Sequence, residues 1–252
     1  MTTVPEALKE AVRHYQAGNL QQAERIYREI RQVDPRNVPA LHLLGLVAHQ
    51  AGRNDFALHC IGEALRLQPN FVEARLNLGL VLAALGRLEE AVASFRLTLA
   101  LQPNLALAHH NLAIVLVQQG KLDEAVARYR QTLQLQPNDA QAHYNLGLAL
   151  AAQGKGDEAV ASYRQALRCH PDYALAHYHL AFALKEQGNL TEAIASYHQA
   201  LRCQPDFAAA HVNLGNALSM QGKLVEAIAS AASLKQSCIR QRFSPVAGFS
   251  PV

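Results

Sequence analysis

The sequence predicts an all-α solenoid built from copies of one helix-turn-helix unit, and two residue types carry this prediction. Glycine and proline recur through the 252-residue chain with a fixed period of 34 residues. The glycines are Gly18, Gly52, Gly86, Gly120, Gly154, Gly188 and Gly222, and the prolines are Pro35, Pro69, Pro103, Pro137, Pro171 and Pro205. Such a period indicates one supersecondary unit copied along the chain, and units of this kind stack on their neighbours.

The unit at residues 106–139 shows why each copy should contain two helices. Its first half, ALAHHNLAIVLVQQ, has apolar residues at helical spacing and is followed by Gly120, a typical helix-ending residue. Its second half, KLDEAVARYRQTLQLQ, opens with Asp123 and Glu124, whose charges suit the positive end of a helix dipole. Pro137 ends this second helix, because the residue before a proline is disfavoured in the α conformation.

Two further sets of residues keep the same period and predict where the helices of a unit cross. A small residue recurs in each first helix from the second unit on, at Gly45, Gly79, Ala113, Gly147, Ala181 and Gly215. The second helices carry an aromatic residue at Tyr27, Phe95, Tyr129, Tyr163 and Tyr197, with Ile61 at the equivalent place in the second unit. At a helical core position such aromatic residues are typical of packing rather than of a ligand platform.

Composition and charge argue against several classes of partner. Half of the residues are hydrophobic, which supplies a continuous core, and the formal net charge is only +3. There is no long run of like charge, so we expect no nucleic-acid partner, and no apolar stretch long enough to span a bilayer, so we expect no membrane partner. The N-terminal residues include Glu6 and Glu10 and lack the apolar segment of a secretory signal.

The four cysteines, Cys60, Cys169, Cys203 and Cys238, are expected to be reduced thiols. Cys169 and Cys203 occupy equivalent places in adjacent units, and stacked helices lie ~8–10 Å apart, too far for a disulfide. Reduced thiols are typical of a cytoplasmic protein, which is the location we expect.

With these residues in view, the pattern resembles the tetratricopeptide repeat, which has one unit per 34 residues. The resemblance implies a right-handed superhelix with repeats at residues 4–37, 38–71, 72–105, 106–139, 140–173 and 174–207 and a partial seventh at 208–234. The tryptophan of the family's first helix is absent, and Arg75, His109, His143, His177 and His211 stand in its place.

A narrower resemblance covers roughly residues 10–230. Segments such as AHHNLAIVLVQQGKLDEAVARYRQTLQLQPN are similar to the repeat region of O-GlcNAc transferases, and the opening residues resemble bacterial members of the SPINDLY-type group. That family carries a glycosyltransferase domain after its repeats, and no catalytic residue of such a domain is recognisable here. The resemblance therefore leaves two functions open, a protein-interaction scaffold that is not an enzyme, and the substrate-recognition arm of a glycosyltransferase whose catalytic domain is absent.

The family resemblance implies that the first helices line a concave groove that binds extended peptide segments. The sixth residue of each unit should face this groove, and these sixth-position residues are Lys9, Leu43, Asn77, Asn111, Asn145, His179 and Asn213. Asparagine is a poor helix former, so its recurrence there is not explained by folding, whereas its amide can both donate to and accept from a peptide backbone. We expect the peptide-binding residues to be Asn77, Asn111, Asn145, His179 and Asn213, with Tyr144 and Tyr178 beside them. The alternative is that repeat duplication copied a tolerated asparagine bonded to neighbouring helices.

Metal, cofactor and catalytic chemistry are not expected. The chain has twelve histidines, but His109, His143, His177 and His211 lie one per unit, too far apart to share an ion. His177 and His179 point to different faces of one helix. No phosphate-binding loop or zinc-protease motif occurs in the sequence.

The last residues depart from the repeat. After residue 230 the expected aromatic residue and proline are missing, and the segment FSPV occurs twice. We expect residues 235–252 to form a disordered tail, and we expect the chain to be a truncated or frame-shifted relative of a longer protein. A solenoid normally ends in a polar capping helix, so its absence predicts self-association through the uncapped C-terminal repeat.

Overall fold

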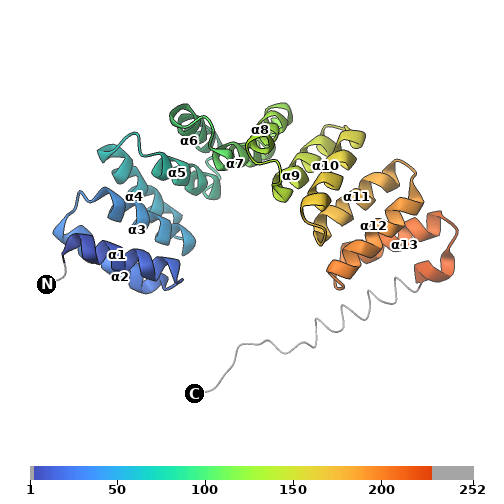
Figure 1. Cartoon of the computed structure of the whole chain (residues 1–252), viewed down its shortest axis with the longest axis horizontal. Coiled ribbons are helices and arrows are strands. Elements are labelled where there is room, and N and C mark those ends of the chain that lie inside the picture. The colour runs from blue at the N-terminus through green and yellow to red at the C-terminus, as the bar shows by residue number, and fades with distance from the viewer. Residues whose placement is uncertain (1–2, 229–252) are drawn as a thin grey trace, which may run out of the picture. The chain divides into compact units, whose positions relative to one another are not determined.

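A computed structural model describes residues 3–228 of the chain, and within them all regular structure is helical (Figure 1). The chain divides into two compact units, residues 1–135 and 136–252, which we call unit 1 and unit 2. The expected tail at residues 235–252, and the end of the partial seventh repeat, lie outside the described residues.

Unit 1 consists of four helix pairs. They are α1 (Val4–Gln16) with α2 (Leu20–Val33), α3 (Val38–Gln50) with α4 (Asn54–Leu67), α5 (Val72–Ala84) with α6 (Leu88–Leu101), and α7 (Ala106–Gln118) with α8 (Leu122–Leu135). We refer to the odd-numbered helices as first helices and the even-numbered ones as second helices.

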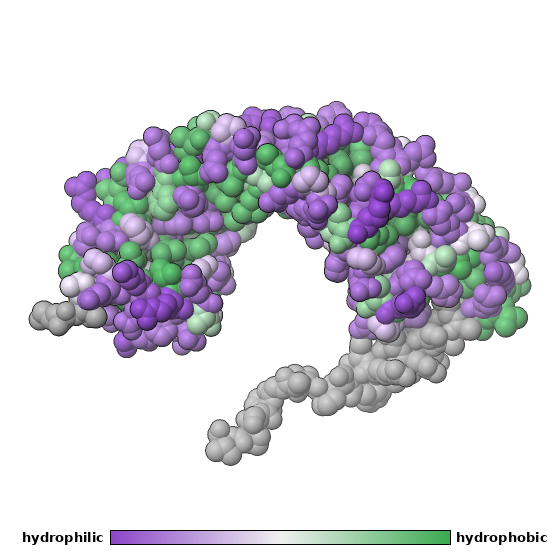
Figure 2. All heavy atoms as spheres, viewed as in Figure 1, coloured by the Kyte–Doolittle hydropathy of each residue, from purple (hydrophilic) through white to green (hydrophobic). Residues whose placement is uncertain are grey.

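Unit 2 continues the same alternation. Its helices are α9 (Ala140–Ala152) with α10 (Gly156–Cys169), α11 (Ala174–Glu186) with α12 (Leu190–Cys203), and α13 (Ala208–Met220). Another second helix begins at Leu224 and is described as far as Ile228, and we call it the Leu224 helix. Hydrophilic side chains predominate on the visible surface, with apolar patches among them (Figure 2).

No helix among the described residues is both long and apolar enough to cross a membrane.

The periodic glycines form the turn inside each pair. Gly120, between α7 and α8, has a φ of 73°, a conformation that residues with a Cβ rarely adopt. The next amide, of Lys121, donates to the carbonyl of Leu116 at 2.9 Å, and the Gly120 amide donates to that of Val117. These bonds satisfy carbonyls that the end of α7 would otherwise leave free.

In the pairs α3–α4, α5–α6 and α9–α10, the small residue of the first helix lies against the bulky residue of the second helix, as the register predicts. A Cβ added to Gly79 would lie 2.5 Å from the ring of Phe95 in unit 1, and one added to Gly147 would lie 2.5 Å from the ring of Tyr163 in unit 2. Both rings are buried. The two helices of these pairs can therefore approach closely only because the side chain at the crossing point is missing.

The histidines at the place of the family's tryptophan bond their first helices, α7, α9, α11 and α13, to the turn before each of them. The ring Nε2–H of His109 donates to the carbonyl of Pro103 at 2.9 Å, and His211 does the same to Pro205 at 2.9 Å. His143 and His177 make the equivalent bond, and the Arg75 guanidinium contacts the carbonyl of Pro69. Each of these bonds spans six positions and links a first helix to the turn that directly precedes it.

Successive pairs within a unit are joined by an apolar core inside and by polar contacts outside. In unit 1 one core cluster brings Leu76 of α5, Phe95 of α6 and Leu112 of α7 together. On the outer surface Arg96 of α6 pairs with Glu124 of α8 at 2.8 Å. In unit 2 the equivalent pair joins Arg164 and Glu192 at 2.6 Å. Such exposed ion pairs contribute little to stability, so the buried side chains hold the pairs together.

The crossing-point glycine gives a direct test of this packing. We expect Gly79→Ala to lower the free energy of unfolding by about 1–3 kcal/mol, because its Cβ would overlap the buried ring of Phe95. Gly62→Ala is the matched control, since Gly62 lies within α4 and a Cβ there meets nothing within 4 Å. That variant should gain up to ~1 kcal/mol from its better helix propensity. Urea unfolding of both variants measures the difference, and equal effects would contradict the packing described.

Candidate functional site

The sixth-position residues of unit 1 lie on first helices that contact one another in order, α3 with α5 and α5 with α7. Leu43, Asn77 and Asn111 are each partly exposed. The Asn77 amide Nδ2–H donates to Nε2 of His42 on α3 at 2.8 Å. Because an amide nitrogen can only donate, Nε2 of His42 is the unprotonated ring nitrogen.

His42 is buried, and this burial decides its ionisation. The residue is 6% exposed, and its ring packs edge-on against Phe71, with 4.8 Å between the ring centroids. Burial lowers the pKa of His42 below its usual value, with a weaker opposing influence of Glu73. The neutral ring therefore stays available as the acceptor for Asn77.

Asn111 has the same place in α7 but a different neighbour. The residue 35 positions before Asn77 is His42, whereas the residue at that interval before Asn111 is Leu76. Leucine offers no acceptor, and among residues 3–228 the side chain of Asn111 makes no hydrogen bond. The Asn111 amide is partly exposed, and Ile114, one helical turn further on, is partly exposed beside it.

In unit 2 the sixth-position residues Asn145, His179 and Asn213 lie on α9, α11 and α13, which also contact in order. All three are partly exposed. The Asn213 amide Nδ2–H donates to the Tyr178 hydroxyl on α11 at 2.8 Å, across the same interval of 35 residues. Asn145 accepts a bond of 3.1 Å from the exposed amide of Gln141.

An aromatic cluster in unit 2 surrounds His179. Its ring centroid lies 5.0 Å from that of Tyr178 and 5.7 Å from that of Tyr144. Tyr144 also contacts Tyr173, and Tyr178 contacts Phe207. Burial lowers the pKa of His179, so this histidine also favours its neutral form. The structure thus brings Tyr144, Tyr178 and His179 together.

Accessibility separates the two predicted tyrosines. Tyr144 is 7% exposed, and burial raises its pKa to about 12, so its ring serves the packing between α9 and its neighbours. Tyr178 is partly exposed, and its hydroxyl reaches Asn213. Exposed apolar side chains on α11 lie at Leu175 and Phe182, four residues before and three residues after His179. Phe182 lies beneath the Lys185 ammonium, 4.8 Å from the ring centroid.

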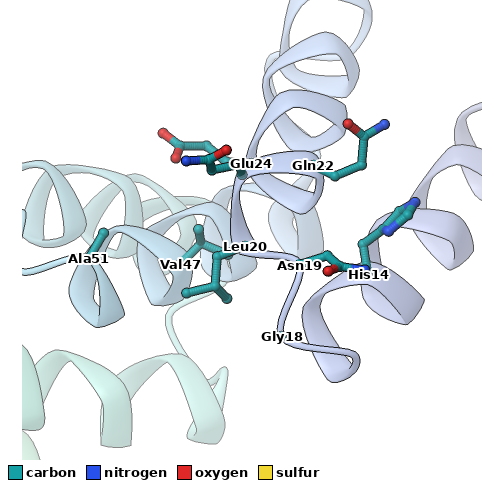
Figure 3. Close-up of a pocket in the computed structure, with 9 residues that line it drawn as sticks. His14, Gly18, Asn19, Leu20, Gln22, Glu24, Val47 and Ala51 are labelled. Carbon is teal, nitrogen blue, oxygen red and sulfur yellow. The ribbon is translucent and has the colours of Figure 1, made fainter. Parts of the chain in front are cut away.

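A hollow of about 640 Å³ lies beside the turn between α1 and α2 (Figure 3). His14 and Glu24 of these helices and Asn19 of the turn lie around it, and Val47 and Ala51 come from α3 and its end. The Glu24 carboxylate already pairs with Arg28 at 2.7 Å and with Arg53 at 2.6 Å. It is therefore engaged in holding α2 to the α3–α4 turn.

Among residues 3–228, no three histidine, cysteine or acidic side chains lie close enough together to bind one metal ion. Cys60 is buried and burial raises its pKa to about 11, so it stays a protonated thiol. The thiols of Cys169 and Cys203 are free.

Sequence reasoning did not identify His42 as a partner of the predicted site. The signal was available, because the residue 35 positions before each sixth-position asparagine decides whether the amide has an acceptor. The role of the histidines bonded to proline carbonyls was also missed, since they were considered only as metal ligands and as replacements for tryptophan.

The contrast between Asn77 and Asn111 generates a stability prediction. Asn77→Ala should lower the free energy of unfolding by about 1 kcal/mol or more, because the buried Nε2 of His42 loses its donor. Asn111→Ala should leave it unchanged or raise it by a few tenths of a kcal/mol, as alanine is the better helix former. Chemical unfolding measures both. If Asn111→Ala were the more damaging change, the assignment of partners would be wrong.

Burial of His42 generates a pH prediction. A histidine whose pKa is lowered by folding stabilises the protein fully above its unfolded pKa of about 6.5, and this stability is lost as pH falls through the lower, folded value. The melting temperature should therefore fall between pH 7.5 and pH 5, and His42→Leu, which copies Leu76, should reduce that fall. His198→Gln, at an exposed histidine on α12, is the control and should leave the pH dependence as it is.

Comparison with known families agrees with the helix pairs. Models described as tetratricopeptide repeat match residues 8–58 and 110–174, residues 71–138, and residues 162–195. A model described as TPR repeat matches residues 183–222. No curated protein matches the chain.

Solved structures show the same fold. A chain of the APC/C hetero-tetramer Cut9–Hcn1 is 22% identical with a TM-score of 0.70, over 86% of this chain and 43% of that one. This chain thus spans less than half the length of that protein. MamA residues 41–end from Desulfovibrio magneticus RS-1 is 23% identical, with a TM-score of 0.64, over 68% of this chain and 96% of that one. YrrB, described as a TPR protein with an unusual peptide-binding site, is 21% identical with a TM-score of 0.62, over 73% and 95%.

These matches identify the repeat, and the narrower resemblance to O-GlcNAc transferases and SPINDLY-type proteins stays a prediction from the sequence. Family models cover residues from all thirteen labelled helices, and the structure supplies the matching helix pairs. The chain belongs to the tetratricopeptide repeat family.

Proposed function

We propose that this chain is a protein-interaction scaffold that binds extended peptide segments along the first-helix faces of its units. The observation that carries the proposal is Asn111. Its amide is partly exposed, lies beside an apolar side chain and has no hydrogen bond within the described residues, so folding does not account for it. An amide that can both donate and accept suits the backbone of an extended peptide.

The other sixth-position asparagines support the same function, because only part of their hydrogen-bonding capacity is used within the protein. Asn77 and Asn213 use one donor each within the protein, and their carbonyl oxygens remain as acceptors for a ligand amide. Leu80, Ile114 and Leu148 follow the asparagines by one helical turn and are partly exposed. This combination favours a peptide bound by its main chain, with apolar side chains packed beside it.

The expected hydrogen-bond free energies indicate weak binding, with an affinity that increases with the length of the peptide. One hydrogen bond contributes ~0.5–1.5 kcal/mol, so no single asparagine would decide affinity. Adjacent first helices lie ~8–10 Å apart, and an extended peptide advances ~3.3 Å per residue. Within one unit, each sixth-position residue would therefore meet about every third residue of the ligand. Among solved relatives, YrrB is described as having a peptide-binding site, which agrees with this use of the fold.

Selection from a displayed peptide library tests the function without knowing the natural partner. Peptides enriched on the full chain should bind the Asn111→Ala, Asn145→Ala double variant at least about fivefold more weakly, since each lost bond is worth ~1 kcal/mol. The melting temperature of the variant is measured beside its affinity, because Asn145 also has contacts within the protein. Gln131→Ala, at an exposed position of α8, is the control and should not alter binding.

Two results would contradict the proposal. One is that no peptide is enriched on the folded chain. The other is that enriched peptides bind the double variant and the parent equally, which would place the binding surface elsewhere.

A further inference from the structure

Three first helices of unit 1 repeat a similar two-residue surface. Each presents its sixth-position residue and, three positions later on the same side of the helix, an apolar residue. We call these residues the unit 1 face, and they are Leu43 and Leu46 on α3, Asn77 and Leu80 on α5, and Asn111 and Ile114 on α7. All six are partly exposed. A ligand that lies across α3, α5 and α7 therefore meets three similar surfaces in succession.

Charged side chains are nearly absent from these three helices. Among their residues only Glu73 and Arg75 are aspartate, glutamate, lysine or arginine. The Arg75 guanidinium contacts the carbonyl of Pro69 in the preceding turn, and Glu73 lies in the first turn of α5. Charges of unit 1 lie instead on second helices, as in the pair of Arg96 and Glu124. A charged ligand residue buried on the unit 1 face would find no counter-charge there, so the face favours an uncharged segment.

The spacing of the first helices agrees with the pitch of a polyproline II helix. Adjacent packed helices lie ~8–10 Å apart, and a polyproline II segment rises ~3.1 Å per residue with three residues per turn, which is about 9.3 Å per turn. Residues i, i+3 and i+6 of such a segment would therefore present one side to α3, α5 and α7 in order. A β-strand cannot do this, because its side chains alternate between two faces, so residues i and i+3 point in opposite directions.

The asparagines of the unit 1 face have hydrogen-bonding capacity that suits this conformation. A polyproline II backbone makes no internal hydrogen bonds, so its carbonyl groups need donors when water is displaced. A side-chain amide has two N–H donors. Asn77 uses one of them on His42, and the side chain of Asn111 uses none among the described residues. Both can donate to ligand carbonyl groups three residues apart, and these bonds need no ligand N–H, so proline is tolerated.

From this agreement we infer that the unit 1 face binds uncharged, proline-containing segments in the polyproline II conformation, with an apolar side chain at every third residue. The inference rests on the proposed function and names its class of peptide. The apolar side chains pack against Leu46, Leu80 and Ile114, while Asn77 and Asn111 hold the main chain. Proline fixes φ near the polyproline II value before binding, so such a segment loses less conformational entropy than a flexible one.

Fluorescence anisotropy of labelled, end-blocked peptides on the full chain tests the period. The regular peptide is three copies of leucine-proline-alanine, and the reordered peptide has the same composition with leucine at its first, third and fifth positions. The regular peptide should bind at least about fivefold more tightly, because only its leucines all reach the unit 1 face. A regular peptide made with D-proline cannot form the left-handed polyproline II helix and should also bind at least about fivefold more weakly than the regular one.

A charge exchange tests where the peptide lies. Ile114→Lys should weaken binding of the regular peptide at least about fivefold, because it replaces apolar contact by an unpaired charge. One of the two peptides with glutamate in place of a terminal leucine should bind Ile114→Lys at least about threefold more tightly than it binds the parent. Leu97→Lys is the matched control, since Leu97 is 52% exposed on the second helix α6, and it should bind the regular peptide as the parent does. Circular dichroism on each variant checks that the helices are retained.

Three results would overturn the inference. They are equal binding of the regular and reordered peptides, equal binding of the regular and D-proline peptides, and an Ile114→Lys variant that binds the regular peptide as the parent does. The inference also fails if none of these peptides binds while library peptides do and lose affinity on Asn111→Ala. In that case the proposed function holds, and the spacing of apolar residues in the enriched peptides shows whether a strand or a helix is bound instead. A chain on which no library peptide is enriched contradicts the proposed function itself.

Discussion

Each helix pair in this chain has an apolar side that only a neighbouring pair can cover, and the rest of the structure depends on that stacking. In unit 1 the cluster around Phe95 and Leu112 joins α5, α6 and α7, and in unit 2 the cluster around Tyr197 and Leu214 joins α11, α12 and α13. A single pair is too small to bury such residues by itself. The exposed faces of the first helices are therefore held in place by contacts on their opposite sides.

Because the opposite sides of the first helices make the stacking contacts, the sixth position can have different hydrogen-bond partners in different repeats. The sixth-position asparagines share a helix face, yet their surroundings are set by the residue 35 positions earlier. His42 gives Asn77 a buried acceptor and Tyr178 gives Asn213 a hydroxyl, whereas Leu76 gives Asn111 nothing. A repeated residue thus need not have a repeated role. The structural interpretation describes Asn77 and Asn213, whereas peptide binding by Asn111 is what we propose.

The helices and their turns could be predicted from sequence because each depends on local chemistry. Gly120 needs a positive φ, Pro137 ends a helix, and Gly79 leaves room for Phe95. The hydrogen bonds of the predicted site could not be assigned in the same way. These bonds depend on which side chain of the preceding repeat reaches the amide. The 34-residue period gives the spacing of side chains but not their direction. Burial of Tyr144 was likewise hidden, because it results from Tyr163, Tyr173 and His179 closing around it.

The bonds from histidines to proline carbonyls have a consequence for how such a chain can change over generations. His109 reaches back six residues to Pro103, and His211 does the same to Pro205, so one extra residue in these turns would separate donor from acceptor. A whole repeat can be gained or lost without that harm, since every joint is rebuilt by its copy. Recombination between 34-residue repeats would then add or remove first helices one at a time. On the proposed function, each step would alter the length of bound peptide by about three residues, with no new chemistry required.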